Sequence, residues 1–262
     1  MNSCLNFDGK YTSFTSVRGN LLMNYFYSYG PLGIFLACFH LFIQRFVTFP
    51  LSLNHSISRQ IKFFSGKKSL IIPNCIDEEF LEKYRKTLKN EDSPLTFVFI
   101  GDLSVRKNPL LLINQLKKIK SHKVFLHIIG DGPLLKKIKE KVNKLEISDK
   151  VLIHGKLREP YEILQKSDVF VLPSYSEGTS RAMLEALFFG VPCLLRDVDS
   201  NKQIFDQNKF LGDVFQKDEQ LHTKMLKIAI KSRKIKNRQS LLPKRFTQTN
   251  VVERFKEILN YE

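Results

Sequence analysis

Between residues 95 and 231 the chain alternates short apolar runs with stretches in which apolar residues recur every three or four positions. The runs have the length and composition of buried strands and lie at residues 95–100, 124–129, 151–154, 168–172 and 193–196. The stretches with helical spacing lie at residues 110–119, 134–145, 160–166, 179–187 and 221–231. Strands that alternate with helices predict a parallel sheet with helices on both faces, which is a Rossmann-like α/β domain.

The first 72 residues show a less regular pattern. An apolar run of twelve residues at 32–43, interrupted by His40, is shorter than the ~20 residues that span a bilayer. We predict a buried helix there, with a helix at a membrane interface as the less favoured alternative. The last segment, residues 245–261, has helical spacing and predicts a terminal helix.

Two glutamates follow the predicted strand at 168–172. Glu177 lies in the turn after the strand, and Glu185 lies two turns into the helix that follows. Ligands of open α/β sheets bind beyond the carboxyl ends of the strands. A helix N-terminus there also favours a phosphate. Two acids that bind hydroxyl groups beside such a helix end predict a site for a sugar-phosphate compound; the alternative is a pair of solvated surface acids.

The segment around these acids, PS-x-x-EG-x5-LEAL-x-x-GVP, resembles the signature of the retaining glycosyltransferases called GT4. The resemblance implies a GT-B-like fold, in which two Rossmann-like domains face each other. It also implies that Glu177 contacts the hexose of a nucleotide sugar donor and that Glu185 holds the ribose hydroxyls.

A second part of the resemblance follows the strand at 95–100. The family has Gly-Arg-Leu there and a lysine six residues after the glycine, and these two cations grip the donor diphosphate. Gly101 and Lys107 match, but Asp102 replaces the arginine. We expect Arg106 of the same loop to substitute. The expected catalytic residues are therefore Glu177, Lys107 and Arg106.

The resemblance assigns the remaining donor contacts to backbone groups. The turn Gly155-Lys156-Leu157 is expected to contact the nucleobase, and the N–H groups of Gly178, Thr179 and Ser180 the diphosphate. Residues 130–133, Gly-Asp-Gly-Pro, lack the third glycine of a dinucleotide fingerprint and predict a structural turn. A nicotinamide-dependent enzyme is therefore disfavoured.

Charge and cysteine content limit the partners that we expect, namely nucleic acid, membrane and metal. The formal net charge is +16, but the lysines are spread along the chain and no nucleic-acid motif accompanies them, so we expect no nucleic-acid partner. Residues 224–245 hold nine Lys and Arg and no acid. A solvated helix face is the favoured interpretation of this block, and contact with a membrane surface is the alternative. The four cysteines lack metal-like spacing, so we expect no metal and no cofactor.

The family resemblance also implies a division of the chain. Residues 1–72 would form a partial acceptor-side domain, 73–94 a linker, 95–244 the donor domain, and 245–262 a helix that crosses back. The segment Pro73-Asn74-Cys75-Ile76-Asp77 resembles the family's entry to this linker, with Cys75 in place of a glycine.

The expected function is transfer of a hexosyl unit, with retention, from a nucleotide sugar to a glycan or lipid-linked acceptor in bacterial surface polysaccharide synthesis. The expected location is the cytoplasm, possibly at the inner face of the membrane. The short N-terminal region and Asp102 favour an alternative, a truncated remnant that binds a nucleotide sugar without catalysis. A subunit whose missing strands come from a partner chain is a further possibility.

Overall fold

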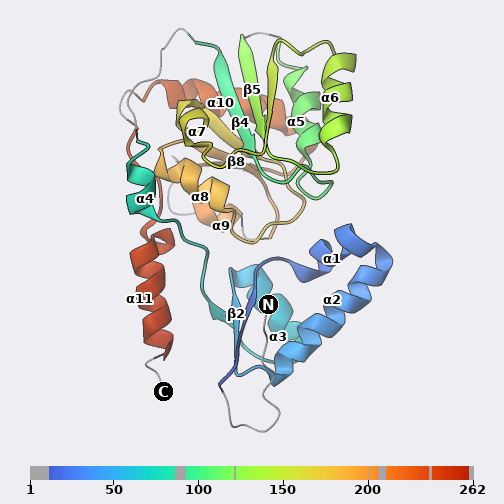
Figure 1. Ribbon diagram of the computed structural model, residues 1–262, viewed down its shortest axis with the longest axis vertical. Helices are drawn as coiled ribbons and strands as arrows, with labels where there is room; N and C mark the ends of the chain where they lie inside the picture. Colours follow the sequence, from blue (N-terminus) through green and yellow to red (C-terminus); the bar gives the residue numbers. More distant parts are fainter. Residues whose placement is uncertain are drawn as a thin grey trace.

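The structure, a computed structural model, describes residues 12–85, 93–120, 122–199, 201–205, 211–235 and 238–259. It contains two parallel β-sheets, one of three strands near the N-terminus and one of six strands in the larger part of the chain (Figure 1). The first sheet and its helices, residues 12–76, are called the N-terminal part below. The second sheet and its helices, residues 95–233, are called the C-terminal domain.

The C-terminal domain has the sheet that the hydrophobic pattern predicts. Its strand order is β6-β5-β4-β7-β8-β9, and every pair is parallel. The strands are β4 (Leu95–Ile100), β5 (Val124–Ile129), β6 (Val151–Gly155), β7 (Val169–Leu172), β8 (Cys193–Arg196) and β9 (Gly212–Phe215). The sequence did not predict β9, because Gly212 and Asp213 interrupt its apolar pattern.

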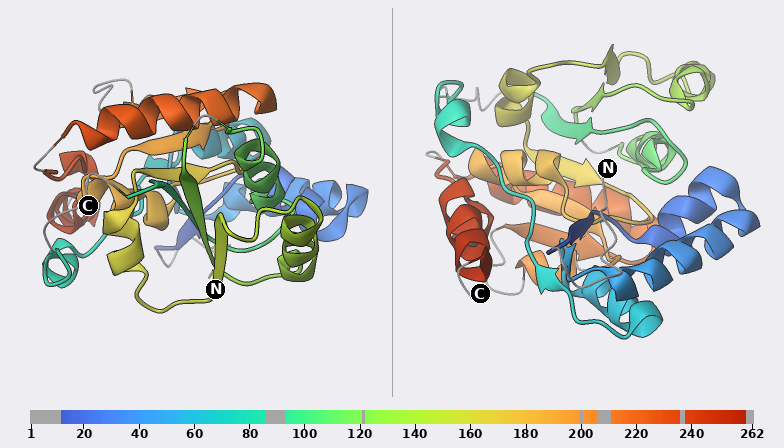
Figure 2. Two further views of the ribbon diagram at one scale, coloured as in Figure 1. Left: turned by 90° about the horizontal axis from the view of Figure 1, so that it is seen from above. Right: turned by 60° about the horizontal axis from the view of Figure 1, so that its bottom comes forward.

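Helices cover this sheet on both faces, since α10 and α7 lie on opposite sides of it (Figure 2, left). The helices are α5 (Pro109–Leu116), α6 (Leu135–Lys144), α7 (Tyr161–Lys166), α8 (Arg181–Phe188), α9 (Lys202–Phe205) and α10 (Leu221–Arg233). The core between the layers holds fully buried phenylalanines at positions 97, 99, 170 and 215. Burial of such large apolar side chains is the main favourable term in folding.

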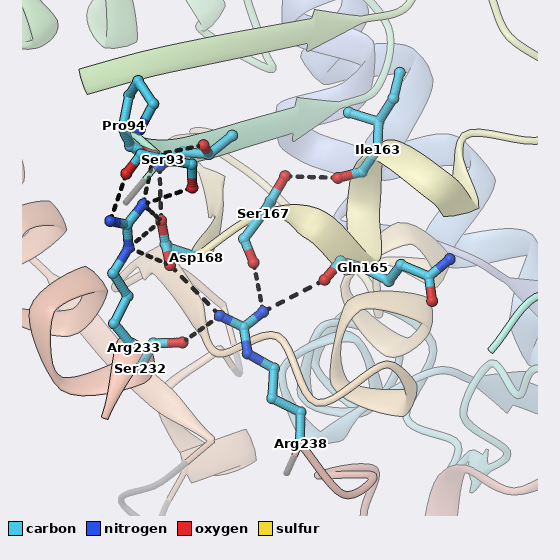
Figure 3. Close-up of polar contacts among 10 residues, drawn as sticks. Ser93, Pro94, Ile163, Gln165, Ser167, Asp168, Ser232, Arg233 and Arg238 are labelled. Atoms are coloured by element: carbon cyan, nitrogen blue, oxygen red, sulfur yellow. Dashed lines mark hydrogen bonds and ion pairs between the residues drawn. The ribbon is translucent and has the colours of Figure 1, made fainter. Parts of the chain in front are cut away.

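One buried carboxylate fixes the amino end of β7. Asp168 is fully buried, accepts a hydrogen bond of 2.7 Å from the N–H of Thr96, and is paired with Arg233 and Arg238 at 3.2 and 3.5 Å (Figure 3). Arg238 also donates to the carbonyl of Ser167 at 2.6 Å. Two arginines of the basic block 224–245 are thus structural, and the prediction of a solvated face is wrong for them.

The N-terminal part is a smaller parallel sheet of order β1-β2-β3, with strands β1 (Phe14–Val17), β2 (Phe49–Ser52) and β3 (Leu70–Ile71). Its helices are α1 (Leu21–Tyr29), α2 (Pro31–Ile43) and α3 (His55–Ser65). Asn20 and Asn54 cap α1 and α3 by accepting hydrogen bonds from Met23 and Ile57.

The prediction of a buried helix at 32–43 is wrong in its burial. The helix α2 forms there, but Leu32, Phe35 and Phe39 are 66%, 75% and 63% exposed. The side that packs against the rest of the N-terminal part carries Gly33, Ala37 and Leu41 instead. Among the described residues, no helix combines the length and the apolarity needed to cross a bilayer.

Two helices join the parts along one side of the molecule (Figure 1). They are α4 (Glu78–Glu82) and α11 (Gln248–Leu259). Ile76 and Thr247 form an isolated β-bridge, and the N–H of Gln248 donates to the Glu78 carboxylate at 2.9 Å. The ring of Phe255 in α11 lies 6.4 Å from that of Phe14 in β1, so this helix contacts the N-terminal part.

Candidate functional site

The loops that follow β4, β5 and β6 meet at one edge of the six-stranded sheet, because parallel strands end on the same side. The N–H of Gly101 donates to the carbonyl of Ile129, and that of Gly130 to the carbonyl of Gly155. A Cβ atom on Gly130, whose φ is +147°, would lie 1.8 Å from the Gly101 carbonyl oxygen. The glycine at 130 thus lets two of these loops touch, and residues 130–133 form the predicted structural turn.

Lys107 and Glu177 meet at this edge. The Lys107 ammonium lies 2.5 Å from a Glu177 carboxylate oxygen, and the two side chains are 13% and 6% exposed. Arg106 donates from its guanidinium to the carbonyl of Ser176 at 2.8 Å, and the N–H of Tyr175 donates to the carbonyl of Arg106. The structure therefore brings the three expected catalytic residues together by joining the loop after β4 to the loop after β7.

Glu185 lies on α8, which begins directly after the Glu177 loop. Ser180 is the N-cap, and its hydroxyl accepts from the N–H of Met183. Burial raises the pKa of the Glu185 carboxyl, and the nearby Arg181 opposes that shift. A carboxyl group in such surroundings makes stronger hydrogen bonds to a ligand hydroxyl than one in water does.

In the loop after Glu177 the backbone carbonyls and the backbone N–H groups have different partners. The carbonyls of Gly178 and Thr179 accept hydrogen bonds from Asn54 and Asn74, at 2.9 and 2.6 Å. Within the ranges that the structure describes, the N–H groups of residues 178–180 donate to no protein acceptor. These groups precede a helix N-terminus, where backbone N–H groups favour an anion.

The expected nucleobase turn lies at the end of β6. Gly155 has a φ of +71°, a left-handed conformation that glycine adopts without strain. Lys156 and Leu157 are exposed. In the described residues neither side chain forms a hydrogen bond or ion pair with Lys107 or Glu177, so this turn belongs to the same sheet edge but not to the Lys107–Glu177 cluster.

Sequence reasoning missed the asparagines that hold the Glu177 loop against the N-terminal part. Asn20 donates to Asp199 at 2.8 Å, and the other oxygen of Asp199 accepts from the N–H of Glu177 at 2.8 Å. Asp199 has a φ of +51°, which is strained for a residue with a side chain. The contacts of Asn20, Asn54 and Asn74 join residues more than 100 positions apart, and no spacing in the chain indicates them.

A close approach accompanies these hydrogen bonds. A Cβ atom on Gly178 would lie 2.7 Å from the carbonyl oxygen of Arg18. The ring of Tyr27 in α1 stacks on that of Tyr175, with centroids 6.0 Å apart, and the Arg196 guanidinium lies over the ring of Tyr175. Burial, followed by the neighbouring Tyr175, raises the pKa of the Tyr27 hydroxyl. The N-terminal part thus reaches the loop that carries Glu177 through both polar and aromatic contacts.

Comparison with known families identifies this architecture. The model of the family "Glycosyl transferases group 1" matches residues 80–241, which is more than half of the chain. The chain belongs to the group 1 glycosyltransferases. This family is the GT4 family that the Glu177–Glu185 segment resembles, so the predicted family is confirmed.

Curated relatives of this glycosyltransferase include two enzymes of Escherichia coli. The chain is 32% identical over 161 residues to UDP-Gal:alpha-D-GlcNAc-diphosphoundecaprenol alpha-1,3-galactosyltransferase. This alignment covers 55% of this chain and 40% of the relative. It is 26% identical over 210 residues to the O-antigen biosynthesis glycosyltransferase WclY. This alignment covers 76% of this chain and 58% of the relative. The chain thus spans between two fifths and three fifths of the length of these relatives.

A solved structure confirms the fold class. The Anabaena protein Alr3699/HepE in complex with UDP-glucose superposes with a TM-score of 0.76 at 15% sequence identity. The alignment covers 95% of this chain and 72% of that one. The fold of this glycosyltransferase is therefore α/β of the GT-B type, as predicted.

The side chains of the site are suited to an anion and a polyol. Lys107 and Arg106 are cations, the N–H groups at 178–180 are hydrogen-bond donors, and the carboxylates of Glu177 and Glu185 have the acceptor oxygens that hydroxyl groups require. In the described part of the chain, no group of three or more His, Cys, Asp and Glu residues has the arrangement of a metal site.

Proposed function

We propose that the chain carries the donor half of a hexosyltransferase, which moves a hexosyl unit from a nucleotide diphosphate sugar to an acceptor hydroxyl with retention. The observation that carries this proposal is the shielded contact of 2.5 Å between Lys107 and Glu177 at the carboxyl edge of the sheet. Membership of the family supports the reaction class, and UDP-glucose bound to the Anabaena neighbour supports a nucleotide sugar as donor.

In this proposal Lys107 stabilises the departing diphosphate. An ammonium group has three donors, and Glu177 occupies one of them, which leaves two for phosphate oxygens. The N–H groups of residues 178–180 and the Arg106 guanidinium add positive potential on the same side. These groups stabilise the negative charge that develops on the diphosphate as the glycosidic bond breaks.

The two glutamates have separate roles in the proposal. Glu177, fixed by Lys107 and by the hydrogen bond from its own N–H to Asp199, orients the hexose. Glu185, in the helix α8 that follows the Glu177 loop, holds the ribose hydroxyls. Gly101, Gly155, Lys156 and Leu157 line the nucleoside end of the donor.

The acceptor assignment comes from the relatives. One acts on a diphosphoundecaprenol-linked sugar and another in O-antigen biosynthesis, by their names. We propose a glycan or lipid-linked acceptor in bacterial surface polysaccharide synthesis, and a location in the cytoplasm at the inner face of the membrane.

Calorimetric titration separates the donor contacts. The ligands are UDP, GDP, their hexose conjugates, and the matching nucleoside without phosphate. We expect Lys107→Ala to weaken binding of the diphosphate at least about tenfold, which is ~1.4 kcal/mol, and to leave nucleoside binding unchanged. We expect Glu185→Gln to weaken both ligands, because both contain the ribose.

The matched control is Glu162→Gln, which removes the charge of an exposed glutamate that is paired with Lys166 on α7. It is expected to bind every ligand like the unaltered chain. The proposal is wrong if no nucleotide binds, or if Glu185→Gln and Glu162→Gln behave alike. Release of free hexose or transfer to an added acceptor, with the anomeric configuration read by NMR, then tests catalysis.

A second candidate function is a nucleotide-sugar-binding subunit without catalysis of its own. Asp102, exposed in the loop after β4, favours it because a carboxylate near the diphosphate opposes binding of that anion. The edge strand β1 also leaves one side of a parallel sheet without a partner strand among the described residues, where a partner chain would pair. Binding without turnover, converted to turnover by an added chain, would support this candidate.

A further inference from the structure

A surface helix usually buries its large apolar residues and exposes its polar ones, but α2 exposes most of its large apolar residues. Gly33 and Ala37 lie on the buried side, and Leu32, Phe35, Leu36, Phe39 and Phe42 are exposed. The exposed set recurs at intervals of one and three residues, which places it along one stripe of the helix. We call these five residues the α2 stripe. Soluble proteins seldom expose a continuous apolar surface of this kind without a function for it.

The packing of α1 on α2 fixes this orientation. A Cβ atom on Gly33 would lie 2.1 Å from the carbonyl oxygen of Tyr25, so the two helices approach closely at that glycine. Rotation of α2 to bury the phenyl rings would replace Gly33 at this contact with a larger residue. The α1–α2 hairpin projects from one side of the molecule, in both views that show it clearly (Figures 1 and 2).

The electrostatics of the surroundings indicate what contacts the stripe. Residues 9–76 contain no Asp and no Glu. Arg45 lies two residues after the end of α2. The helix α3, which packs against α2, carries Arg59 and Lys62, and all three side chains are exposed. Phe63, beside Lys62, is 83% exposed. A stripe of phenylalanine and leucine in a segment whose only charged side chains are cationic matches a surface that is apolar inside and anionic outside.

We propose that the α2 stripe docks onto an anionic lipid bilayer, with α2 lying in the plane of the interface. The thirteen residues of α2 extend about 20 Å, less than the ~30 Å of a hydrocarbon core, so the helix lies on the membrane and does not cross it. Phenyl and leucyl groups enter the acyl boundary, and the arginines and lysines bind lipid phosphates.

A second copy of the chain fits this surface less well. A two-fold symmetric interface brings the same patch of each copy together. Such an interface would bring together two copies of a segment whose charged residues are all cationic, with no acid of residues 9–76 to neutralise them. The purpose of this docking rests on the proposed function, because docking would bring the site to a lipid-linked acceptor at the bilayer surface.

Vesicle flotation tests the docking without donor or acceptor, so that its failure is distinct from a failure of the proposed function. The vesicles are phosphatidylcholine alone and phosphatidylcholine mixed with phosphatidylglycerol. We expect the chain to float with the anionic vesicles, less at high salt, and weakly or not at all with the neutral ones. The double variant Phe35→Ser/Phe39→Ser is expected to lower the partition coefficient at least about tenfold.

The control variant is Ile230→Ser/Val252→Ser, which removes two exposed apolar residues outside the N-terminal part, 40% and 42% exposed. It is expected to float like the unaltered chain. UDP titration and the free energy of unfolding, measured on each variant, show that the proteins are folded. No flotation with anionic vesicles, or equal flotation of both double variants, would overturn the proposal. So would a concentration-dependent dimer that Phe35→Ser/Phe39→Ser dissociates, because the stripe would then be an interface between copies.

Discussion

The C-terminal domain and the N-terminal part use apolar residues in different ways. In the C-terminal domain the apolar strands are enclosed between helices, and Phe97, Phe99 and Phe170 are completely buried. In the N-terminal part the most apolar helix, α2, buries a glycine and an alanine and exposes phenylalanines. Both are parallel α/β arrangements, and both helical patterns are readable from the sequence.

The difference teaches that an apolar run predicts an element but not what that element contacts. The buried strand at 95–100 and the exposed helix at 31–43 both read as runs of apolar residues in the sequence. The burial of α2 was mispredicted for this reason. The contrast is quantitative, because the same substitution should destabilise one region strongly and the other hardly at all.

The largest expected difference is between Phe170→Ala and Phe35→Ala. Truncation of a fully buried phenylalanine leaves a cavity, so we expect Phe170→Ala to lower the free energy of unfolding by about 3–5 kcal/mol. Phe35 is 75% exposed, and its truncation should change stability by less than about 0.5 kcal/mol. Urea denaturation followed by circular dichroism measures both. A cost near 3 kcal/mol for Phe35→Ala would show that α2 is buried in solution and would break the contrast.

The next prediction concerns charge inside the C-terminal domain. Asp168→Ala leaves Arg233 and Arg238 without their carboxylate in a nearly buried position, and we expect a loss of about 3 kcal/mol (Figure 3). Glu162→Ala breaks an exposed pair with Lys166 of the same helix and should cost no more than about 0.5 kcal/mol. Equal effects in urea denaturation would mean that the Asp168 cluster is solvated and that β7 is not fixed by it.

A smaller effect is expected in the N-terminal part at Gly33. The added methyl group of Gly33→Ala would lie within 2.1 Å of a backbone carbonyl and would force α1 and α2 apart. We expect a loss of about 1–3 kcal/mol. The control is Ser28→Ala, an exposed position on α1, with a change below about 0.5 kcal/mol. If Gly33→Ala is neutral, α2 rotates freely and its stripe has no fixed orientation.

The smallest expected effect is a pH dependence of the C-terminal domain. His127 and His154 lie on neighbouring strands with ring nitrogens 2.8 Å apart, and burial together with the neighbouring His154 lowers the pKa of His127 to about 4. The unfolded chain, with the ordinary pKa of 6.5, then binds the proton first. Stability should therefore fall as the pH decreases from about 6.5 towards 4. In urea denaturation at several pH values, His127→Asn should reduce this fall in the free energy of unfolding. An unchanged fall would mean that other groups cause it.

Much of the fold was predictable because strong local signals agree. The strands β4, β5 and β8 begin and end at the predicted residues, since each is a mainly apolar run with proline, glycine or a charged residue at its borders. The strand β9 was missed because Gly212 and Asp213 interrupt its pattern.

The candidate site was predictable in its charged residues and not in its supports. Glu177 and Lys107 belong to motifs with fixed spacing within two loops. Asn20, Asn54 and Asp199 act through contacts between distant segments, and such contacts depend on the tertiary arrangement alone. Their contribution to donor binding stays a prediction, as do the roles of Glu177, Glu185 and Lys107.

Hydrogen–deuterium exchange with mass spectrometry tests most directly the claim that the two regions have different ligands. The chain is measured alone, with a saturating nucleotide diphosphate, and with anionic vesicles. The account predicts that the nucleotide slows exchange in residues 101–108 and 177–185 and leaves 31–43 unchanged, and that vesicles slow exchange in 31–43 and leave 101–108 and 177–185 unchanged. Protection of 31–43 by the nucleotide, or vesicle protection that spares 31–43 and appears in residues 224–235, would contradict it.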